Sequence, residues 1–126
     1  MSRRVVITGL GLVTPLGIGV DETWSALCQG RSGIGEITRF DTTDFTTKIA
    51  GEVKDFNAEA FLPKKDAKRT EKFIAFAVAG ARMALEDARF TIDDTNGHRV
   101  GVITGCGLGG LEMLEKTSQI VEKKEP

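Results

Sequence analysis

The residues best suited to nucleophilic chemistry in this chain of 126 residues are Cys28, Cys106 and His98. Cys106 lies between two glycines where a strand is expected to give way to a helix, and a helix N-terminus lowers the pKa of a thiol. His98 lies beyond the other end of that strand, Arg99–Thr104, about 20 Å away at 3.3 Å per residue. The two side chains therefore cannot pair across the strand, and we interpret both cysteines as structural.

The same residues leave little for a metal ion or a disulfide framework. One histidine and two distant cysteines cannot supply four ligands at the spacings of zinc sites, so we expect no metal. Two cysteines in unrelated contexts are also too few for a disulfide scaffold. This usage predicts a reducing compartment, and we expect the protein to be cytoplasmic.

A glycine-rich turn, GCGLGG at positions 105–110, offers a second kind of chemistry. Gly105, Gly107 and Gly110 match G-x-G-x-x-G, in which backbone N–H groups and a helix N-terminus hold a pyrophosphate. That motif requires an acidic residue about 20 residues further on, at the end of the next strand. Only Glu122 and Glu125 come near this spacing, and both belong to a charged helical tail. We therefore favour the interpretation that these glycines permit a tight turn, and we keep a small dinucleotide-binding module as an alternative.

Basic residues gather along one stretch at helical spacing, where most of them share a face: Lys64, Lys65, Lys68, Arg69 and Lys72. Such a face suits an acidic partner. Asp66 and Glu71 dilute its charge, however, and basic residues at a helix start oppose the helix dipole. From composition alone, a solvated helix start is the favoured interpretation.

Composition excludes several classes of protein. A net charge of −1 and a sequence pI of about 5.9 argue against general binding to nucleic acid or anionic lipid. The longest apolar run, Phe73–Ala79, is far shorter than the roughly 20 residues that a membrane helix requires. The start, Met1 to Arg4, is basic, but a short apolar run and glycines follow, so no signal peptide is expected. We predict one soluble domain.

Two segments are predicted to be strands buried on both faces, because each is a continuous β-branched run. These are Arg4–Thr8 and Arg99–Thr104, which begin the similar sequences RVVITGLGL and RVGVITGCGL. Each continues through Gly-x-Gly toward a helix. The pair indicates a weak internal duplication or two uses of one strand–turn–helix solution. A weaker alternating pattern over Thr47–Lys54 predicts an edge strand.

Helical periodicity predicts helices that would pack against these strands. Asp21 is expected to cap a helix over Asp21–Gln29 that Gly30 ends, and its stripe of Trp24, Leu27 and Cys28 is expected to dock on a strand.

A long helix from Pro63 to about Ala88 has an apolar middle typical of burial between layers. A polar loop over Asp93–Gly97 precedes the second strand, and a last helix follows Gly110. Two or three strands cannot cover so apolar a helix, so the fold is expected to be unfinished.

Several spaced motifs together resemble one family. RRVVITGLGLVTPLG at 3–17, then Trp24 and Leu27 before GRSGI at 30–34, and GVITGCGLGGL at 101–111 resemble condensing enzymes of the thiolase fold, the β-ketoacyl-acyl carrier protein synthases. Leu108 and the TPLG of the first loop resemble the type II synthases. Cys106 stands where the family usually has serine, and the resemblance gives it no catalytic role.

The resemblance implies an α/β fold, layered α-β-α-β-α in the intact enzyme, with residues 1–126 forming the front part of its first half. It also implies an acyltransferase that elongates fatty acids by decarboxylative condensation with malonyl-acyl carrier protein, without a cofactor. The nucleophilic cysteine and two histidines of the family lie further along. This chain alone is therefore expected to be inactive, and to aggregate through exposed apolar faces.

The same resemblance implies roles for a few residues and partners. Leu108 matches a position that lines the acyl-chain pocket, and Lys65, Lys68 and Arg69 match a basic helix that docks the acidic carrier protein. That carrier would bear acyl and malonyl groups on phosphopantetheine, and the intact enzyme would be a homodimer. A polyketide-type ketosynthase is the main alternative within this family.

Overall fold

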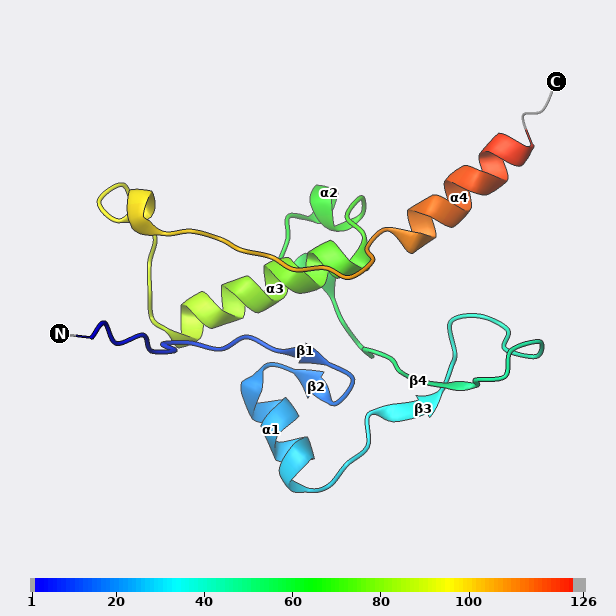
Figure 1. The fold of residues 1–126 in the computed structure, drawn as a ribbon, viewed down its shortest axis with the longest axis horizontal. Helices are drawn as coiled ribbons and strands as arrows, with labels where there is room; N and C mark the ends of the chain where they lie inside the picture. Colours follow the sequence, from blue (N-terminus) through cyan, green and yellow to red (C-terminus); the bar gives the residue numbers. More distant parts are fainter. Residues whose placement is uncertain (1, 124–126) are drawn as a thin grey trace.

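A computed structural model describes residues 2–123 of the chain. Figure 1 shows helix α3 in the middle, with the remaining elements spread along it and α4 extending beyond one end. The elements in order are β1 (Val13–Thr14), β2 (Gly17–Ile18), α1 (Val20–Cys28), β3 (Ile34–Glu36), β4 (Ile49–Gly51), the 3₁₀ turn η1 (Ala58–Ala60), α2 (Lys64–Ala67), α3 (Lys72–Asp87), the 3₁₀ turn η2 (Gly97–Arg99) and α4 (Leu111–Glu122).

The strands form two short antiparallel pairs. β1 pairs with β2 through Val13 opposite Ile18, and β3 pairs with β4 through Gly35 opposite Ala50. β4 lies in the middle of the predicted edge strand Thr47–Lys54, so that prediction is confirmed in position and shortened in length. β1 and β2 form a tight hairpin, while β3 and β4 pair across the loop 37–48.

The two strands predicted to be buried, Arg4–Thr8 and Arg99–Thr104, are not strands in the described residues. The chain is extended in both: the first lies beyond the C-terminal end of α3 and the second runs alongside α3 (Figure 1), and Arg99 at the start of the second belongs to η2. Ile7 is 81% exposed and Ile103 is 99% exposed. A strand needs a neighbour to pair its backbone groups, and residues 2–123 offer these segments none. Their β-branched sequence still marks them as segments that gain by burial.

Helix α1 begins and ends close to the prediction but buries a different face. Gly19, with φ of 99°, precedes it, so Asp21 lies in the first turn rather than at the cap, while Gly30 ends the helix with φ of 67° as predicted. The buried residues are Thr23 and Ala26, whereas the predicted stripe is exposed: Trp24, Leu27 and Cys28. The prediction of a docked stripe was wrong, because the small face packs against β2 and leaves the large side chains outside.

The predicted long helix from Pro63 to Ala88 is two helices. α2 ends at Ala67, and Glu71, with ψ of 153°, is extended before α3 begins. Amide groups of Arg69 and Thr70 both donate to the Asp66 carbonyl, which closes α2 as a single turn. The apolar stretch therefore lies on α3 alone, and a bend separates it from the basic residues other than Lys72.

The described core is small and sits where α1 and α3 present alanines. Ala26, Ala75 and Ala79 are its buried apolar residues, and no larger side chain in residues 2–123 is fully buried. Phe56 adds an edge-to-face contact with Phe76 of α3, with ring centroids 4.8 Å apart. Many large apolar side chains of the described residues are left exposed, among them Ile7, Trp24 and Ile103.

Backbone contact fixes the first extended segment on α3. Methyl groups built on Gly9 and Gly11 would overlap the carbonyl oxygens of Ala84 and Gly80, so only glycine allows this approach. The carboxylate of Asp87 also accepts a hydrogen bond from the Leu10 amide at 2.8 Å. The segment is thus held to the second half of α3 by its own backbone.

Candidate functional site

The turn at 105–110 is the part of the candidate site that carries Leu108, which is 69% exposed. The extended run from Gly101 leads into it, and α4 begins directly after Gly110, whose φ of 79° is left-handed. A Cβ on Gly109 would lie 2.6 Å from Cε2 of Phe73, so the ring of α3 presses against this backbone. The turn is therefore positioned by the first turn of α3.

The glycine motif is poorly arranged for a pyrophosphate. A Cβ on Gly105 or Gly107 would meet nothing within 4 Å among the described residues, so these glycines line no cradle. At Gly110 the nearest group is the carboxylate of Glu71, 3.6 Å from a built Cβ, and Glu112 lies in the first turn of α4. Carboxylates at a helix N-terminus occupy the positive end that a phosphate would need. The geometry disfavours the dinucleotide-binding alternative.

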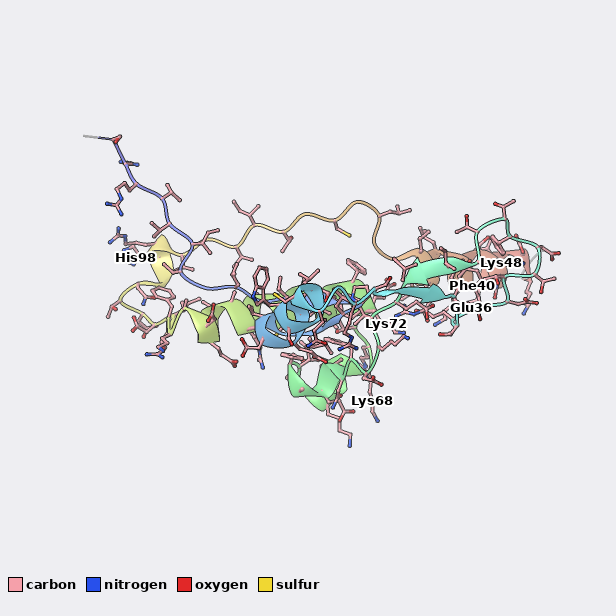
Figure 2. All side chains as sticks on the ribbon, turned by 90° about the horizontal axis from the view of Figure 1, so that it is seen from below. Glu36, Phe40, Lys48, Lys68, Lys72 and His98 are labelled. Carbon is pink, nitrogen blue, oxygen red and sulfur yellow. The ribbon has the colours of Figure 1, made fainter. Side chains whose placement is uncertain are left out.

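The sole histidine and Cys106 belong to different parts of the fold. Cys106 is exposed in the turn, while η2 holds the sole histidine, His98, before the extended run begins. Figure 2 shows His98 at the opposite end of the molecule from Lys48 and Phe40 of the β3–β4 hairpin. Along the chain, the extended run that follows η2 separates His98 from Cys106.

An apolar groove of about 600 Å³ lies between α3 and the extended run Val102–Cys106. Phe73, Ala77 and Val102 are among its lining residues, and each lining side chain that the structure describes is uncharged. The lining also includes Cys106, but among the described residues the groove holds no histidine, carboxylate, amine or guanidinium that could act as a base for its thiol. It is suited to cover by apolar groups rather than to chemistry.

The predicted docking residues lie around the bend between α2 and α3, and all are exposed. Lys65 is in α2, Lys68 ends it, and Arg69 follows in the connection. A groove of about 450 Å³ between this bend and α4 is lined by Lys68, Arg69 and Lys72, but Lys65 is outside it. In Figure 2, Lys68 projects away from the body while Lys72 lies close to it. The structure thus brings Lys68 and Arg69 to one groove, with Lys72 as a further cation.

The opposite wall of this basic groove belongs to α4, and sequence reasoning missed it. Lys116 and Glu112 form an ion pair with 2.6 Å between Nζ and Oε1. The hydrogen bond from Lys116 lowers the pKa of Glu112, which Lys72 and Arg39 lower further. Glu112, and then Glu71, raise the pKa of Lys116. The i, i+4 spacing was a signal for this pair in the sequence.

Residues 2–123 contain no group of three or more histidine, cysteine, aspartate or glutamate side chains that could hold a metal ion. Over the same residues, none of the helices has the length and apolar character needed to cross a membrane.

Comparison with known proteins gives consistent matches. The model of the family described as β-ketoacyl synthase, N-terminal domain, matches residues 2–125. The chain is 46% identical over 125 residues, 99% of its length, to 3-oxoacyl-[acyl-carrier-protein] synthase 2 of Synechocystis sp., and covers 30% of that relative. The chain therefore spans about 30% of the length of such curated relatives.

Two solved structures resemble the described fold. A β-ketoacyl synthase from Burkholderia phymatum matches with a TM-score of 0.77 and 30% identity, covering 98% of this chain and 31% of that one. The ishigamide ketosynthase/chain length factor matches with a TM-score of 0.63 and 44% identity, covering 73% of this chain and 23% of that one. The packing of these elements around α3 is thus found within much larger ketosynthase chains.

Proposed function

We propose, because this chain belongs to the β-ketoacyl synthase family, that the full-length gene product elongates acyl chains in fatty-acid biosynthesis as a type II synthase. The observation that carries this proposal is the 46% identity, over 99% of this chain, to a 3-oxoacyl-[acyl-carrier-protein] synthase 2. The order of the glycine-rich turns along the chain supports it.

The reaction proceeds in two steps. A cysteine thiolate attacks the thioester of acyl carrier protein, takes the acyl group and releases the carrier thiol. Malonyl-carrier protein then loses carbon dioxide, its enolate carbon attacks the acyl carbonyl, and the cysteine thiolate leaves. The product is a β-ketoacyl chain two carbons longer on the carrier. The nucleophile and its two histidines lie in sequence beyond this chain, so residues 1–126 alone are inactive.

Leu108 lines the pocket for the acyl chain in this proposal. Its side chain is apolar and 69% exposed, at the tip of a turn held by α3. Side-chain volume in an apolar pocket discriminates chain lengths by about 10- to 200-fold per methylene. Leu108 is therefore the residue of this chain expected to influence which acyl groups are accepted.

Lys65, Lys68 and Arg69 dock the acidic carrier protein. All three are exposed around the α2–α3 bend, and two of them line the basic groove together with Lys72. Exposed charges of this kind mainly accelerate encounter, and their effect falls as salt rises. The carrier would reach this surface with its acyl or malonyl group on phosphopantetheine.

In the full-length protein these elements belong to a layered α-β-α-β-α domain and to a homodimer. The exposure of Val5, Ile7, Val102 and Ile103 supports this proposal, because such side chains are normally buried in a sheet. The two extended segments would become strands once neighbours pair with their backbones.

A second candidate, a polyketide-type ketosynthase, is favoured by the 44% identity to the ishigamide ketosynthase/chain length factor. It shares the condensation step and differs in the acyl substrate. The choice between the two depends on sequence beyond this chain.

Mass spectrometry of the carrier protein tests the proposal. The full-length gene product is incubated with saturated acyl-carrier protein and malonyl-carrier protein, and residues 1–126 serve as the control. We expect a β-ketoacyl carrier two carbons longer from the full-length protein and none from the control. Activity only with polyketide-type acyl groups would favour the second candidate, and no product with any acyl group would refute both.

A further inference from the structure

The first turn of α3 and the residue before it make two consecutive contacts with the turn that carries Leu108. The ring of Phe73 lies against the backbone of Gly109, where a built Cβ would be 2.6 Å from Cε2 and 2.7 Å from Cζ. One residue further, the carboxylate of Glu71 lies beside Gly110. Leu108 is thus attached to a point of the backbone that α3 fixes from one side.

The rest of the same turn lacks such support. A Cβ on Gly105 or Gly107 would meet nothing within 4 Å among the described residues, and Cys106 is exposed. The contact of Phe73 with Gly109 is therefore the one that determines where the backbone beside Leu108 stands. Gly109 has no side chain that could move aside, so a shift of the ring transmits directly to it.

We propose that Phe73 is a positioning residue for acyl-chain selection, whose ring sets the place of Leu108. This inference rests on the proposed function, in which Leu108 lines the acyl pocket. Phe73 itself need not touch the substrate. A smaller side chain at 73 would remove the ring atoms that lie against the Gly109 backbone, so the turn could move toward α3 and carry Leu108 with it.

The positional part of the inference is tested through Cys106, three residues before Gly109. The rate at which a maleimide alkylates Cys106 is measured in the full-length gene product by peptide mass spectrometry. Gly109→Ala should change this rate several-fold, since the added methyl meets the ring. Combining it with Phe73→Ala should return the rate toward that of the wild type. Gly107→Ala is the matched control and should leave the rate unchanged. An unchanged rate in Gly109→Ala would overturn the inference.

The functional part is tested by comparing kcat/KM for a long and a short acyl-carrier protein. Phe73→Leu, which retains an apolar side chain, should change the ratio of the two values about tenfold, in the range expected for one methylene. Phe45→Leu is the control, because Phe45 lies 56% exposed in the β3–β4 loop. A merely structural role would lower both values together and leave their ratio unchanged.

The variant Leu108→Ala distinguishes a failure of this inference from a failure of the proposed function. A ratio that responds to Leu108→Ala but not to Phe73→Leu would overturn the inference and leave the proposed function standing. A wild-type protein that elongates no acyl chain would refute the proposed function, and the role of Phe73 in chain selection with it.

Discussion

The two extended segments, RVVITGLGL at 4–12 and RVGVITGCGL at 99–108, are close in sequence but differ in how α3 holds them. In the first, Gly9 and Gly11 press against carbonyl groups of α3, and Asp87 bonds the Leu10 amide. In the second, built Cβ atoms on Gly105 and Gly107 meet nothing within 4 Å among residues 2–123, and Phe73 contacts the backbone at Gly109, just after the segment.

The difference shows that a glycine's role is set by what lies opposite it. Gly80 and Ala84 of α3, and Ala88 directly after it, recur every four residues and form a face of small residues that the first segment approaches. The second segment faces Phe73 and Ile74 across an apolar groove instead. The first segment is therefore anchored to α3. The second leaves its turn adjustable near Leu108, the residue proposed to contact substrate.

Both segments carry exposed β-branched side chains that the proposed sheet would bury, and a charge placed among them gives the largest predicted effect. Ile103→Lys should destabilise the full-length protein on the order of 4 kcal/mol, since the proposed sheet would bury an unpaired charge. In residues 1–126 alone, where Ile103 is 99% exposed, it should leave helix content unchanged and reduce light scattering from aggregates. Urea unfolding and circular dichroism measure the two effects. Glu115→Lys on exposed α4 is the control, and equal effects of both changes in the full-length protein would show that Ile103 is not buried there.

The second largest effect is expected from adding a methyl group at Gly11, compared with the same change at Gly107. Gly11→Ala should cost about 1–3 kcal/mol, because the added methyl overlaps the Gly80 carbonyl and the backbone must shift. Gly107→Ala should cost less than about 0.5 kcal/mol. The midpoints of urea unfolding of the two variants measure these losses of stability. Equal losses would remove the distinction between an anchored and an adjustable segment.

The side-chain anchor of the first segment contributes less. Asp87→Asn retains an acceptor oxygen but loses the charge, and should cost about 0.5 kcal/mol through the weaker bond to the Leu10 amide. Glu86→Gln, at the exposed neighbouring position, is the matched control and should be neutral. Hydrogen exchange of the Leu10 amide gives a direct readout, and protection that is unaffected by Asp87→Asn would contradict the anchor.

The smallest effect belongs to the β3–β4 hairpin, away from both segments. Bonds from the Thr38 hydroxyl, at 2.7 Å, and from the Thr38 amide lower the pKa of Glu52 below its ordinary value of 4.5. A carboxyl whose pKa is lower when folded adds stability above pH 4.5, and that stability is lost as the pH falls through the lowered value.

Thr38→Val should therefore weaken the protein slightly at pH 7 and hardly at all at pH 3. Urea unfolding at both pH values measures this, with Thr47→Val as the control. A loss of the same size at both pH values would contradict the assigned cause.

The sequence was informative where local chemistry decides structure. Gly30 as a helix end and the last helix after Gly110 are confirmed, because helix ends depend on neighbours in the chain. The strand around Ile49–Gly51 is also confirmed, and it pairs with Ile34–Glu36 across the loop 37–48. The family identified from the spaced glycine motifs is also confirmed.

Predictions from the sequence fail where the structure depends on contacts between residues far apart in the chain. Arg4–Thr8 is not a strand, since ladder partners are lacking in residues 2–123, and α1 buries Thr23 rather than the larger Trp24 because of the close approach of β2. The break at Glu71 divides the long helix that periodicity predicted.

The candidate site shows the same division. Leu108, Lys65, Lys68 and Arg69 were identified by resemblance, and their roles stay predictions. The contact of Phe73 with Gly109 joins residues 36 positions apart, and no local pattern indicates it.

Transfer of an acyl group onto the protein tests the central claim most directly. The full-length gene product is incubated with acyl-carrier protein alone, and its intact mass and peptide map are measured. The account predicts a gain of one acyl group on a cysteine beyond residue 126, with Cys28 and Cys106 unmodified. Acylation of Cys106, or no acylation at all, would contradict the assignment of this chain to the non-catalytic front part of a condensing enzyme.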